Sequence, residues 1–343
     1  MIKFNKLCKS LGKALLITVV LFGLFSSLIG CSTPTPTTTA TVTTIKTEVP
    51  NPVTTIVTTT QTQTPNPITT TATVTATPTT PKPANPQLIL ATTTSTRDTG
   101  LLDVLIPMFQ AQTGYQVKTV AVGSGAAITM ARQGQADVLL VHSPDDELKL
   151  VADGFGINRL LVMHNDFVIV GPTADPAGIK GMTDPVAAMK KIADTQSLFV
   201  SRDDASGTNA YELGIWAQLG ITSKGQSWWL STGQAMGATL IITSQKNGYT
   251  ISDRGTYLTF FNSKAINSIK MVENPAVMVN PYHVIQVNPA KFTGINAAGA
   301  QAFSDFMLAP ATQAAISNFG LVTYSQALFI PDAGKTEASI GSK

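Results

Sequence analysis

The sequence predicts an α/β protein whose two lobes close on each other like a clamshell, carried on a disordered, Thr/Pro-rich N-terminal stalk. Strand-like and helix-like patterns alternate from residue 87 onward. Two similar apolar segments, 166-DFVIVGP-172 and 282-YHVIQVNP-289, lie far apart in the chain. Residues 33–86 hold 24 threonines among 54 residues. A packed core is therefore expected only after this segment.

The first thirty residues resemble a lipoprotein signal peptide. Basic residues, beginning with Lys3 and Lys6, precede an apolar run over 14–29 that ends in small residues. The tetrad 28-LIGC-31 resembles a bacterial lipobox, in which cleavage before the cysteine leaves that cysteine lipidated. We expect residues 1–30 to be removed and Cys31 to carry the lipid. The alternative is an uncleaved signal anchor with a cysteine at its end.

The stalk is expected over residues 31–86. Its threonines and scattered prolines come with almost no charge, so the segment cannot bury enough apolar surface to offset its ordering entropy. We expect a disordered or partly extended tether between Cys31 and the folded part.

Composition limits the chemistry of the folded part. The cysteines are Cys8 and Cys31, both ahead of it, which excludes a thiol nucleophile or a cysteine-ligated metal there. Three histidines, His142, His164 and His283, are far apart and show no metal-ligand spacing. No metal and no cofactor is expected. The net charge of +3 includes the basic start of the chain, so nucleic acid is not expected as a partner.

Elements follow one another as strand, helix, strand. Apolar runs predict strands over 88–91, 116–122, 137–141, 167–171, 198–200 and 284–287. Helical stripes follow over 101–109, 126–133, 146–153, 208–220 and within 294–320. This order predicts parallel pairing with right-handed crossovers.

The two similar segments mark the passages between lobes. A chain that leaves one lobe and returns to it needs two crossings, and these segments supply them. We expect a discontinuous lobe I over 87–167 and 283–335, lobe II over 168–282, and a tail over 336–343.

Four strand-to-helix corners are rich in hydroxyl groups and glycine: 91-ATTTST-96, 123-GSGAAI-128, 142-HSPDD-146 and 201-SRDDASGTN-209. Ligands of open α/β sheets bind beyond the carboxyl ends of strands, where helix N-termini favour anions. Ser, Thr and Asp are also ordinary helix caps, so one corner alone would not indicate a ligand. Arg202 adds a fixed cationic fork for an oxyanion, although it could instead pair with Asp203 or Asp204.

The chain from about Leu88 to Leu328 resembles the tungstate-binding component of tungstate ABC transporters, which is close kin of the molybdate- and phosphate-binding proteins. The resemblance rests on these stretches: 91-ATTTST-96, 99-TGLLDVLIPMF-109, 118-KTVAVGSGAAI-128, 136-ADVLLVHSP-144, 153-DGFGINRLLVMHNDFVIVGPTADPAGIKG-181 and 198-LFVSRDDASGT-208. It implies a type II periplasmic-binding-protein fold, an oxyanion in the cleft, and delivery to a membrane permease with its ATPase.

The resemblance also implies the ligand contacts. By position these are Thr93, Thr94, Ser95, Ser124, Gly125, Arg202, Ser206, Gly207 and Thr208. One departure is visible, because the family usually reads S-R-G-D-D-S-G-T where this chain has 201-SRDDASGT-208. Asp203 replaces a glycine and Ala205 replaces an aspartate.

The expected function is that of an extracytoplasmic, lipid-anchored solute-binding protein, monomeric and without enzymatic activity, that captures tungstate for an ABC importer. The alternatives with the same fold bind molybdate, phosphate or sulfate. A phosphate site would use an acceptor carboxylate such as Asp203, Asp204 or Asp253. Remoter alternatives are a secreted serine hydrolase, although no G-x-S-x-G is present, and a cell-surface adhesion module.

Overall fold

The computed structural model describes residues 38–44, 55–61, 68–74 and 83–342. The chain divides into two compact units, residues 1–78 and 79–343. The predicted signal peptide and the lipidation site at Cys31 lie outside the described residues. In the part that is described, no helix is both long and apolar enough to cross a bilayer.

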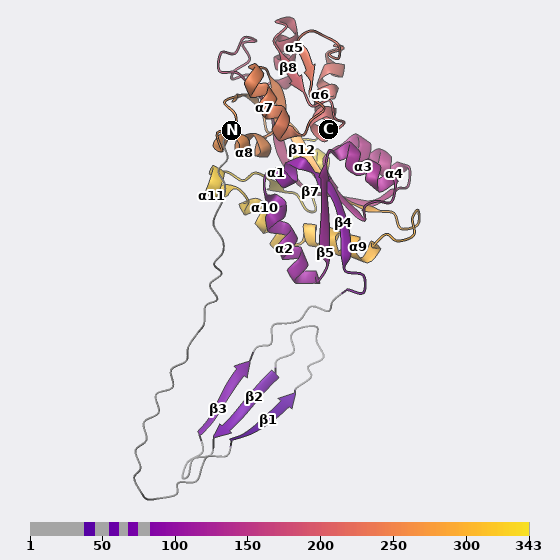
Figure 1. Ribbon diagram of the computed structural model, residues 1–343, viewed down its shortest axis with the longest axis vertical. Coiled ribbons are helices and arrows are strands. Elements are labelled where there is room, and N and C mark those ends of the chain that lie inside the picture. Colours follow the sequence, from indigo (N-terminus) through magenta and orange to yellow (C-terminus); the bar gives the residue numbers. More distant parts are fainter. Residues whose placement is uncertain (1–37, 45–54, 62–67, 75–82, 343) are drawn as a thin grey trace, which may run out of the picture. The chain divides into compact units, whose positions relative to one another are not determined.

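The first unit contains a three-stranded antiparallel sheet (Figure 1). Its strands are β1 (Thr38–Thr44), β2 (Thr55–Gln61) and β3 (Ile68–Val74). Each consists largely of β-branched threonine, valine and isoleucine, whose restricted side chains favour an extended backbone. The extended conformation agrees with the predicted stalk, and the pairing of the strands is an additional finding.

The second unit is built on an eight-stranded sheet with the main order β10-β7-β12-β6-β4-β5. These strands are β4 (Gln87–Thr93), β5 (Gln116–Val122), β6 (Val138–Val141), β7 (Gly156–Gly171), β10 (Thr250–Asp253) and β12 (Val279–Val287). Two more strands, β11 (Ile269–Glu273) and β13 (Ile330–Pro331), pair with β7. A separate parallel pair joins β8 (Phe199–Ser201) and β9 (Trp229–Ser231).

Parallel pairing holds for only part of this unit. Strand β4 pairs in parallel with β5 and β6, but β12 is antiparallel to both β6 and β7, and β10 and β11 are antiparallel to β7. The prediction of parallel pairing throughout was therefore wrong for the crossing strands. Segments that return from another lobe are not bound by the crossover rule that governs consecutive strand–helix–strand units.

Helices cover the sheets on both sides. The helices before β7 are α1 (Thr94–Asp98), α2 (Leu101–Thr113), α3 (Ser124–Arg132) and α4 (Pro144–Ala152). The helices between β7 and β12 are α5 (Pro185–Asp194), α6 (Gly207–Gln218), α7 (Met236–Lys246) and α8 (Arg254–Asn262). They are followed by α9 (Ala297–Leu308), α10 (Pro310–Asn318) and α11 (Leu321–Tyr324). Figure 1 shows α5, α6 and α7 around β8 at one end of the second unit, and α2 and α9 beside β4 and β5 at the other, with α10 next to α2.

Two sets of hydrophobic clusters confirm the two-lobed α/β architecture. Two clusters are built from residues 88–163 and 282–329, around side chains such as Phe109 and Phe303. The other two use residues 167–278, around side chains such as Trp216 and Tyr249. Each fully buried aromatic or aliphatic side chain contributes about 2 kcal/mol to folding, so each lobe has a substantial core of its own.

The C-terminal tail packs against the rest of the second unit. Its short 3-10 helix, Glu337–Ile340, places Glu337 Oε1 2.6 Å from Arg159 Nη1 and 3.2 Å from His283 Nε2. A Cβ added to Gly341 would lie 2.9 Å from the carbonyl oxygen of Ala276. The tail therefore contacts residues of both predicted lobes.

Candidate functional site

The first corner lies where β4 runs into α1. All five hydroxyl residues from Thr92 to Thr96 are buried. Thr92 donates from Oγ1 to the carbonyl of Leu140 at 2.8 Å, and Thr96 donates to the carbonyl of Thr93 at 2.7 Å. These two hydroxyls therefore stabilise the corner. Thr94 differs, because its Oγ1 is buried without a hydrogen-bond partner among the described residues.

Ser95 links this corner to the crossing strand β12. Its Oγ lies 2.9 Å from Thr93 Oγ1 and 3.0 Å from the hydroxyl of Tyr282. Asn280 donates from Nδ2 to that hydroxyl at 3.3 Å and to Asn165 Oδ1 at 2.7 Å. A buried polar network thus joins α1 to both crossing strands, β7 and β12.

The corner at the start of α3 contacts the loop that follows β8. Gly125 donates its backbone N–H to the carbonyl of Ala205 at 3.1 Å. A Cβ added to Gly125 would lie 2.5 Å from that carbonyl oxygen, so only glycine permits this approach. Ser124 Oγ accepts from the backbone N–H of His142 at 3.3 Å, which ties the third corner to the second.

Arg202 is the buried cation of the site, with an exposed fraction of 3%. Its Nη2 donates to Asp204 Oδ2 at 2.6 Å, so the alternative pairing considered from the sequence is present in the structure. The pairing does not use the whole guanidinium, because Nε is buried and finds no partner within residues 83–342. A buried donor left in this state costs about 1–3 kcal/mol, which a bound oxyanion would offset.

The start of α6 closes against the third corner. Ser206 caps the helix, with Oγ accepting from the backbone N–H of Asn209 at 3.3 Å. A Cβ on Gly207 would lie 2.1 Å from the carbonyl oxygen of His142, so the two backbones are in direct contact. The next residue, Thr208, has a buried Oγ1 without a partner in the described part of the chain.

The loop between Arg202 and α6 has a strained backbone. Asp203 has φ 45° and Ala205 has φ 54°, the left-handed region that costs non-glycine residues about 1–2 kcal/mol. The glycine that the family usually has at this position would adopt the same backbone conformation without strain. Asp203 offsets part of the strain, since its carboxylate accepts from Ser231 Oγ at 2.8 Å and lies 3.3 Å from Lys224 Nζ. Strain of this kind is typical of ligand-binding loops.

Glu212 stabilises the residues that lead into this loop. Its carboxylate accepts from Ser201 Oγ at 2.6 Å and from the indole N–H groups of Trp216 and Trp229, each at 3.1 Å. Ser201 in turn accepts from the backbone N–H of Asp203 at 3.1 Å. Trp216 and Trp229 thus support the loop that carries Arg202.

Burial controls the charges around Arg202. Burial, together with the positive charge of Arg202, lowers the pKa of His142 to about 3. His142 is therefore neutral at pH 7, and its Nδ1–H donates to Asn280 Oδ1 at 2.9 Å. Burial raises the pKa of Asp253, although the charge of Arg202 opposes that effect. Asp253 Oδ2 also lacks a partner among the residues that the structure describes.

The predicted contact residues therefore fall into two groups. Thr94, Arg202 and Thr208 each keep a buried polar atom without a partner within residues 83–342. The other predicted residues make the framework: Thr93 and Ser95 bond each other, Ser124 bonds His142, Gly125 bonds Ala205, Ser206 caps α6, and Gly207 packs on His142. The bond from Gly125 to Ala205 and the packing of Gly207 on His142 bring the start of α6 and the loop before it into contact with the second and third corners.

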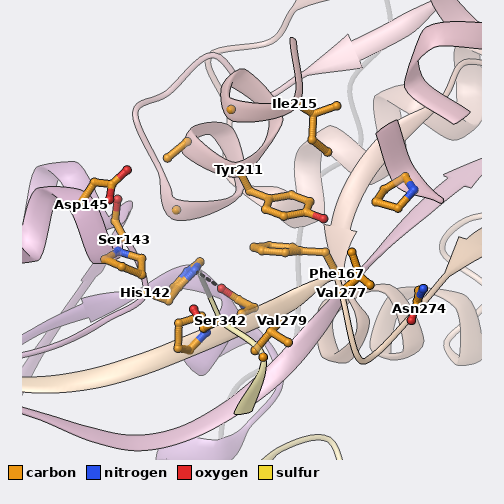
Figure 2. Close-up of a pocket in the computed structure, with 18 of the residues that line it drawn as sticks. His142, Ser143, Asp145, Phe167, Tyr211, Ile215, Asn274, Val277, Val279 and Ser342 are labelled. Atoms are coloured by element: carbon orange, nitrogen blue, oxygen red, sulfur yellow. Dashed lines mark hydrogen bonds between the residues drawn. The ribbon is translucent and has the colours of Figure 1, made fainter. Parts of the chain in front are cut away.

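A cavity of about 760 Å³ lies beside this contact (Figure 2). Of the predicted site residues in the described chain, only Gly207 lines it. The rings of Phe167 and Tyr211 stack in its wall with centroids 4.4 Å apart, and Asp145 lies on another side. Asp146 and Asp184 also line the cavity. Three aspartate side chains in the lining disfavour a dianion, so the cavity is not the candidate anion site.

Several residues of the site were missed or left without a role by the sequence analysis. Asn165, Asn280 and Tyr282, which form the central network, were not predicted. Asp253 was named only as a possible phosphate acceptor, and its carboxyl group interacts with the charge of Arg202. The available signal was polar side chains inside otherwise apolar strands, since β7 and β12 are buried through most of their length. Which polar side chains meet depends on strand register, which the sequence does not reveal.

Comparison with known proteins places the chain in a class and then in a family. A PBP superfamily domain matches residues 37–311, and the chain belongs to that superfamily of binding proteins. Two relatives are named tungstate-binding protein TupA. The protein from Peptoclostridium acidaminophilum is 45% identical over 254 residues, covering 74% of this chain and 88% of that protein. The protein from Campylobacter jejuni is 37% identical over 241 residues, covering 70% and 88%.

Comparison with a solved structure points to the same family. The tungstate-binding protein TupA from Desulfovibrio alaskensis G20 shares 44% identity and a TM-score of 0.61, covering 72% of this chain and 99% of that one. The chain belongs to the TupA family of the PBP superfamily.

Proposed function

We propose that this protein is the solute-binding component of an ABC importer and that it captures tungstate between its two lobes. The observation that carries the proposal is the buried guanidinium of Arg202, whose Nε has no partner in the described chain, at a contact between hydroxyl-rich corners of both lobes. Relatives named as tungstate-binding proteins supply the identity of the anion.

The negative charge of the anion explains why Arg202, Thr94 and Thr208 are the proposed contacts. A dianion loses its hydration when the lobes close, and neutral dipoles alone offset that loss poorly. Arg202 supplies a fixed positive charge, while Thr94 and Thr208 supply hydroxyl donors. These groups are held by the framework before the anion arrives, which lowers the entropy cost of binding. No covalent step is part of this function, and we propose no enzymatic activity.

Closure of the lobes follows from the same contacts. The bond from Gly125 to Ala205 and the packing of Gly207 on His142 both join residues of lobe I to residues of lobe II, with the lobe boundaries proposed from the sequence. Opening must break both contacts to release the anion. We infer hinge motion about the crossing strands β7 and β12.

The cellular setting completes the proposal. Lipidation at Cys31 would hold the protein on the outer face of the membrane, next to its permease and ATPase. We propose a monomer, because the lobes must move freely with respect to each other. Metabolic labelling with a palmitate analogue tests the anchor, since wild-type protein should be labelled and Cys31→Ser should not.

Calorimetric titration of residues 79–343, the second compact unit, tests the ligand. Tungstate should bind tightly, and Arg202→Ala should weaken binding by at least about 100-fold, since truncating one partner of a desolvated charge pair costs about 3 kcal/mol or more. Titrations with molybdate, phosphate and sulfate measure selectivity. Stronger binding of phosphate would overturn the proposed ligand, and no binding of any oxyanion would overturn the proposed function.

A further inference from the structure

Asp253 is a fully buried carboxyl group that the proposed function has not yet used. It ends β10 and caps α8, with Oδ1 accepting from the backbone N–H of Thr256 at 2.8 Å. Its other oxygen, Oδ2, is buried and makes no hydrogen bond within the described chain. A carboxylate oxygen in this state is costly, because a buried charge needs partners to offset its lost hydration.

The neighbours of Asp253 place it beside the candidate anion site. A Cβ added to Gly255 would lie 3.4 Å from Asp253 Oδ1, 2.8 Å from Thr99 Cγ2 and 3.9 Å from Asn165 Nδ2. Position 255 therefore lies between Asp253, the residue after α1, and the central network. Arg202 interacts electrostatically with the carboxyl as well.

The charged and titratable groups facing Asp253 come from four elements. Arg202 of the loop after β8 favours its charged form, and Asp98 of α1 disfavours it. Tyr282 of β12 is neutral, because burial raises its pKa. Arg254 of α8 donates instead to Asp166, at 2.7 Å, and to Glu273, at 2.8 Å.

The charge available to an anion is therefore small. Arg202 already bonds Asp204 at 2.6 Å, so a second ionised carboxylate nearby would leave two negative groups around one cation. A dianion entering such a site would be repelled.

We propose that Asp253 contacts the bound oxyanion as a neutral carboxylic acid, donating its Oδ2–H to an anion oxygen. The proton comes from solvent wherever the free protein holds Asp253 ionised, and it returns to solvent when the anion leaves. The proposal rests on the proposed oxyanion function and adds a residue that determines which oxyanions fit. Burial, which raises the pKa of Asp253, supports the neutral form.

This donor gives a physical basis for selectivity. Tungstate, molybdate and sulfate carry no proton near pH 7, so each of their oxygens can accept a hydrogen bond. Phosphate is partly protonated and needs an acceptor for its own O–H. A neutral Asp253 that donates provides no such acceptor at Oδ2. The site therefore favours fully deprotonated oxyanions, which agrees with a tungstate-binding family rather than a phosphate-binding one.

Infrared difference spectroscopy of tungstate-loaded against free protein tests the protonation state directly. Loaded wild-type protein should show the C=O band of a protonated carboxyl group, sensitive to H/D exchange, that is missing in loaded Asp253→Asn. Asn keeps both the helix cap and a donor, so this variant should stay folded and bind tungstate within about tenfold of wild type. Asp253→Ala removes the donor and should lose about 10- to 100-fold in affinity.

The matched control is Asp194→Asn, which changes an exposed carboxylate paired with Lys190 and should keep the carboxylic-acid band. Tungstate affinity of the wild type should also fall, by up to about tenfold per pH unit, once pH exceeds the pKa of Asp253, and Asp253→Asn should not show this fall.

Tungstate binding that depends on Arg202 but shows no carboxylic-acid band from Asp253 would overturn this inference and leave the proposed function standing. Failure of the wild type to bind any oxyanion would overturn both.

Discussion

Arg202 and Arg254 are both buried arginines that follow the end of a short strand, yet their surroundings differ. Arg254 has an exposed fraction of 8% and uses Nε, Nη1 and Nη2 in bonds to Asp166 and Glu273. Arg202 bonds one carboxylate, that of Asp204, and keeps Nε without a partner among the described residues. Arg254 therefore serves the fold, whereas Arg202 has donor capacity left for a ligand.

The loops around the two arginines differ in the same sense. Arg254 begins a regular helix with a capping aspartate, Asp253. Arg202 begins a loop in which Asp203 and Ala205 have positive φ angles. A satisfied charge in regular structure and an incompletely satisfied charge in strained structure are the expected signatures of stability and of function, respectively.

The largest expected effect is a difference in the free energy of unfolding between variants of the two arginines. Arg254→Gln should lower the free energy of unfolding by about 3 kcal/mol, because it leaves the buried Asp166 carboxylate without its cation. Arg202→Gln should change stability much less, because the site around it is already incompletely satisfied. Thermal unfolding of both variants measures this difference. Equal losses of stability would contradict the separation of roles.

A smaller effect should come from the contact that encloses Arg202. Gly207→Ala places a Cβ 2.1 Å from the carbonyl oxygen of His142, so the lobes cannot close fully. Tungstate affinity should fall about tenfold or more, in line with overpacking costs of about 1–3 kcal/mol. Titration calorimetry is the measurement.

The matched control for Gly207 is in the same helix. Gly214→Ala adds a methyl group where no described atom lies within 4 Å, and should leave affinity unchanged. Unaltered binding by Gly207→Ala would show that this contact is not required for capture.

The tail offers a second ion cluster, in which Glu337 lies beside Arg159 and His283. Hydrogen bonding by His283 and the charge of Arg159 lower the pKa of Glu337 from 4.5 to about 2. The stabilisation is therefore fully present above pH 4.5 and is lost as pH falls toward 2. Glu337→Gln should melt about 2–4 °C below wild type at pH 7, and the difference should narrow as the pH is lowered below 4.5. A difference that does not depend on pH would exclude this carboxylate as its source.

The smallest effect concerns the strain beside Arg202. Ala205→Gly should raise the free energy of unfolding by about 0.5 kcal/mol, since relief of the left-handed backbone outweighs the greater freedom of glycine in the unfolded chain. Ala210→Gly, in the regular part of α6, should lower it by about 1 kcal/mol. Chemical denaturation resolves the opposite signs. Destabilisation by both changes would mean that Ala205 is not strained.

Much of the fold could be predicted from local sequence pattern. The strand at 116–122 matches β5, and the predicted strands at 88–91 and 137–141 match β4 and β6 within a few residues. Strand β10 and helices α7 and α8 were not predicted, because residues 236–262 mix apolar, glycine and threonine residues without a clear period. The length of β7 was also missed, since its first half alternates with charged Arg159 and polar residues.

The site could be predicted only in part. Hydroxyl-rich corners and Arg202 are visible as motifs, and the structure brings Gly125, His142, Ala205 and Gly207 into contact. The roles of Tyr282 and Asp253 depend on which strands lie side by side, and the antiparallel return of β12 could not be inferred from the order of elements. Long-range register, rather than residue type, was the missing information.

The two crossing strands are themselves paired, with Val279 opposite Asp166 and the Phe167 N–H bonded to the Met278 carbonyl at 2.7 Å. The lobes are thus joined by a hydrogen-bonded ribbon rather than by two independent loops. Two strands paired in this way can bend together about one axis, but they resist sliding past each other. The two lobes should therefore return to the same relative alignment each time they close. The hinge motion proposed above would then need only elastic bending of this paired ribbon.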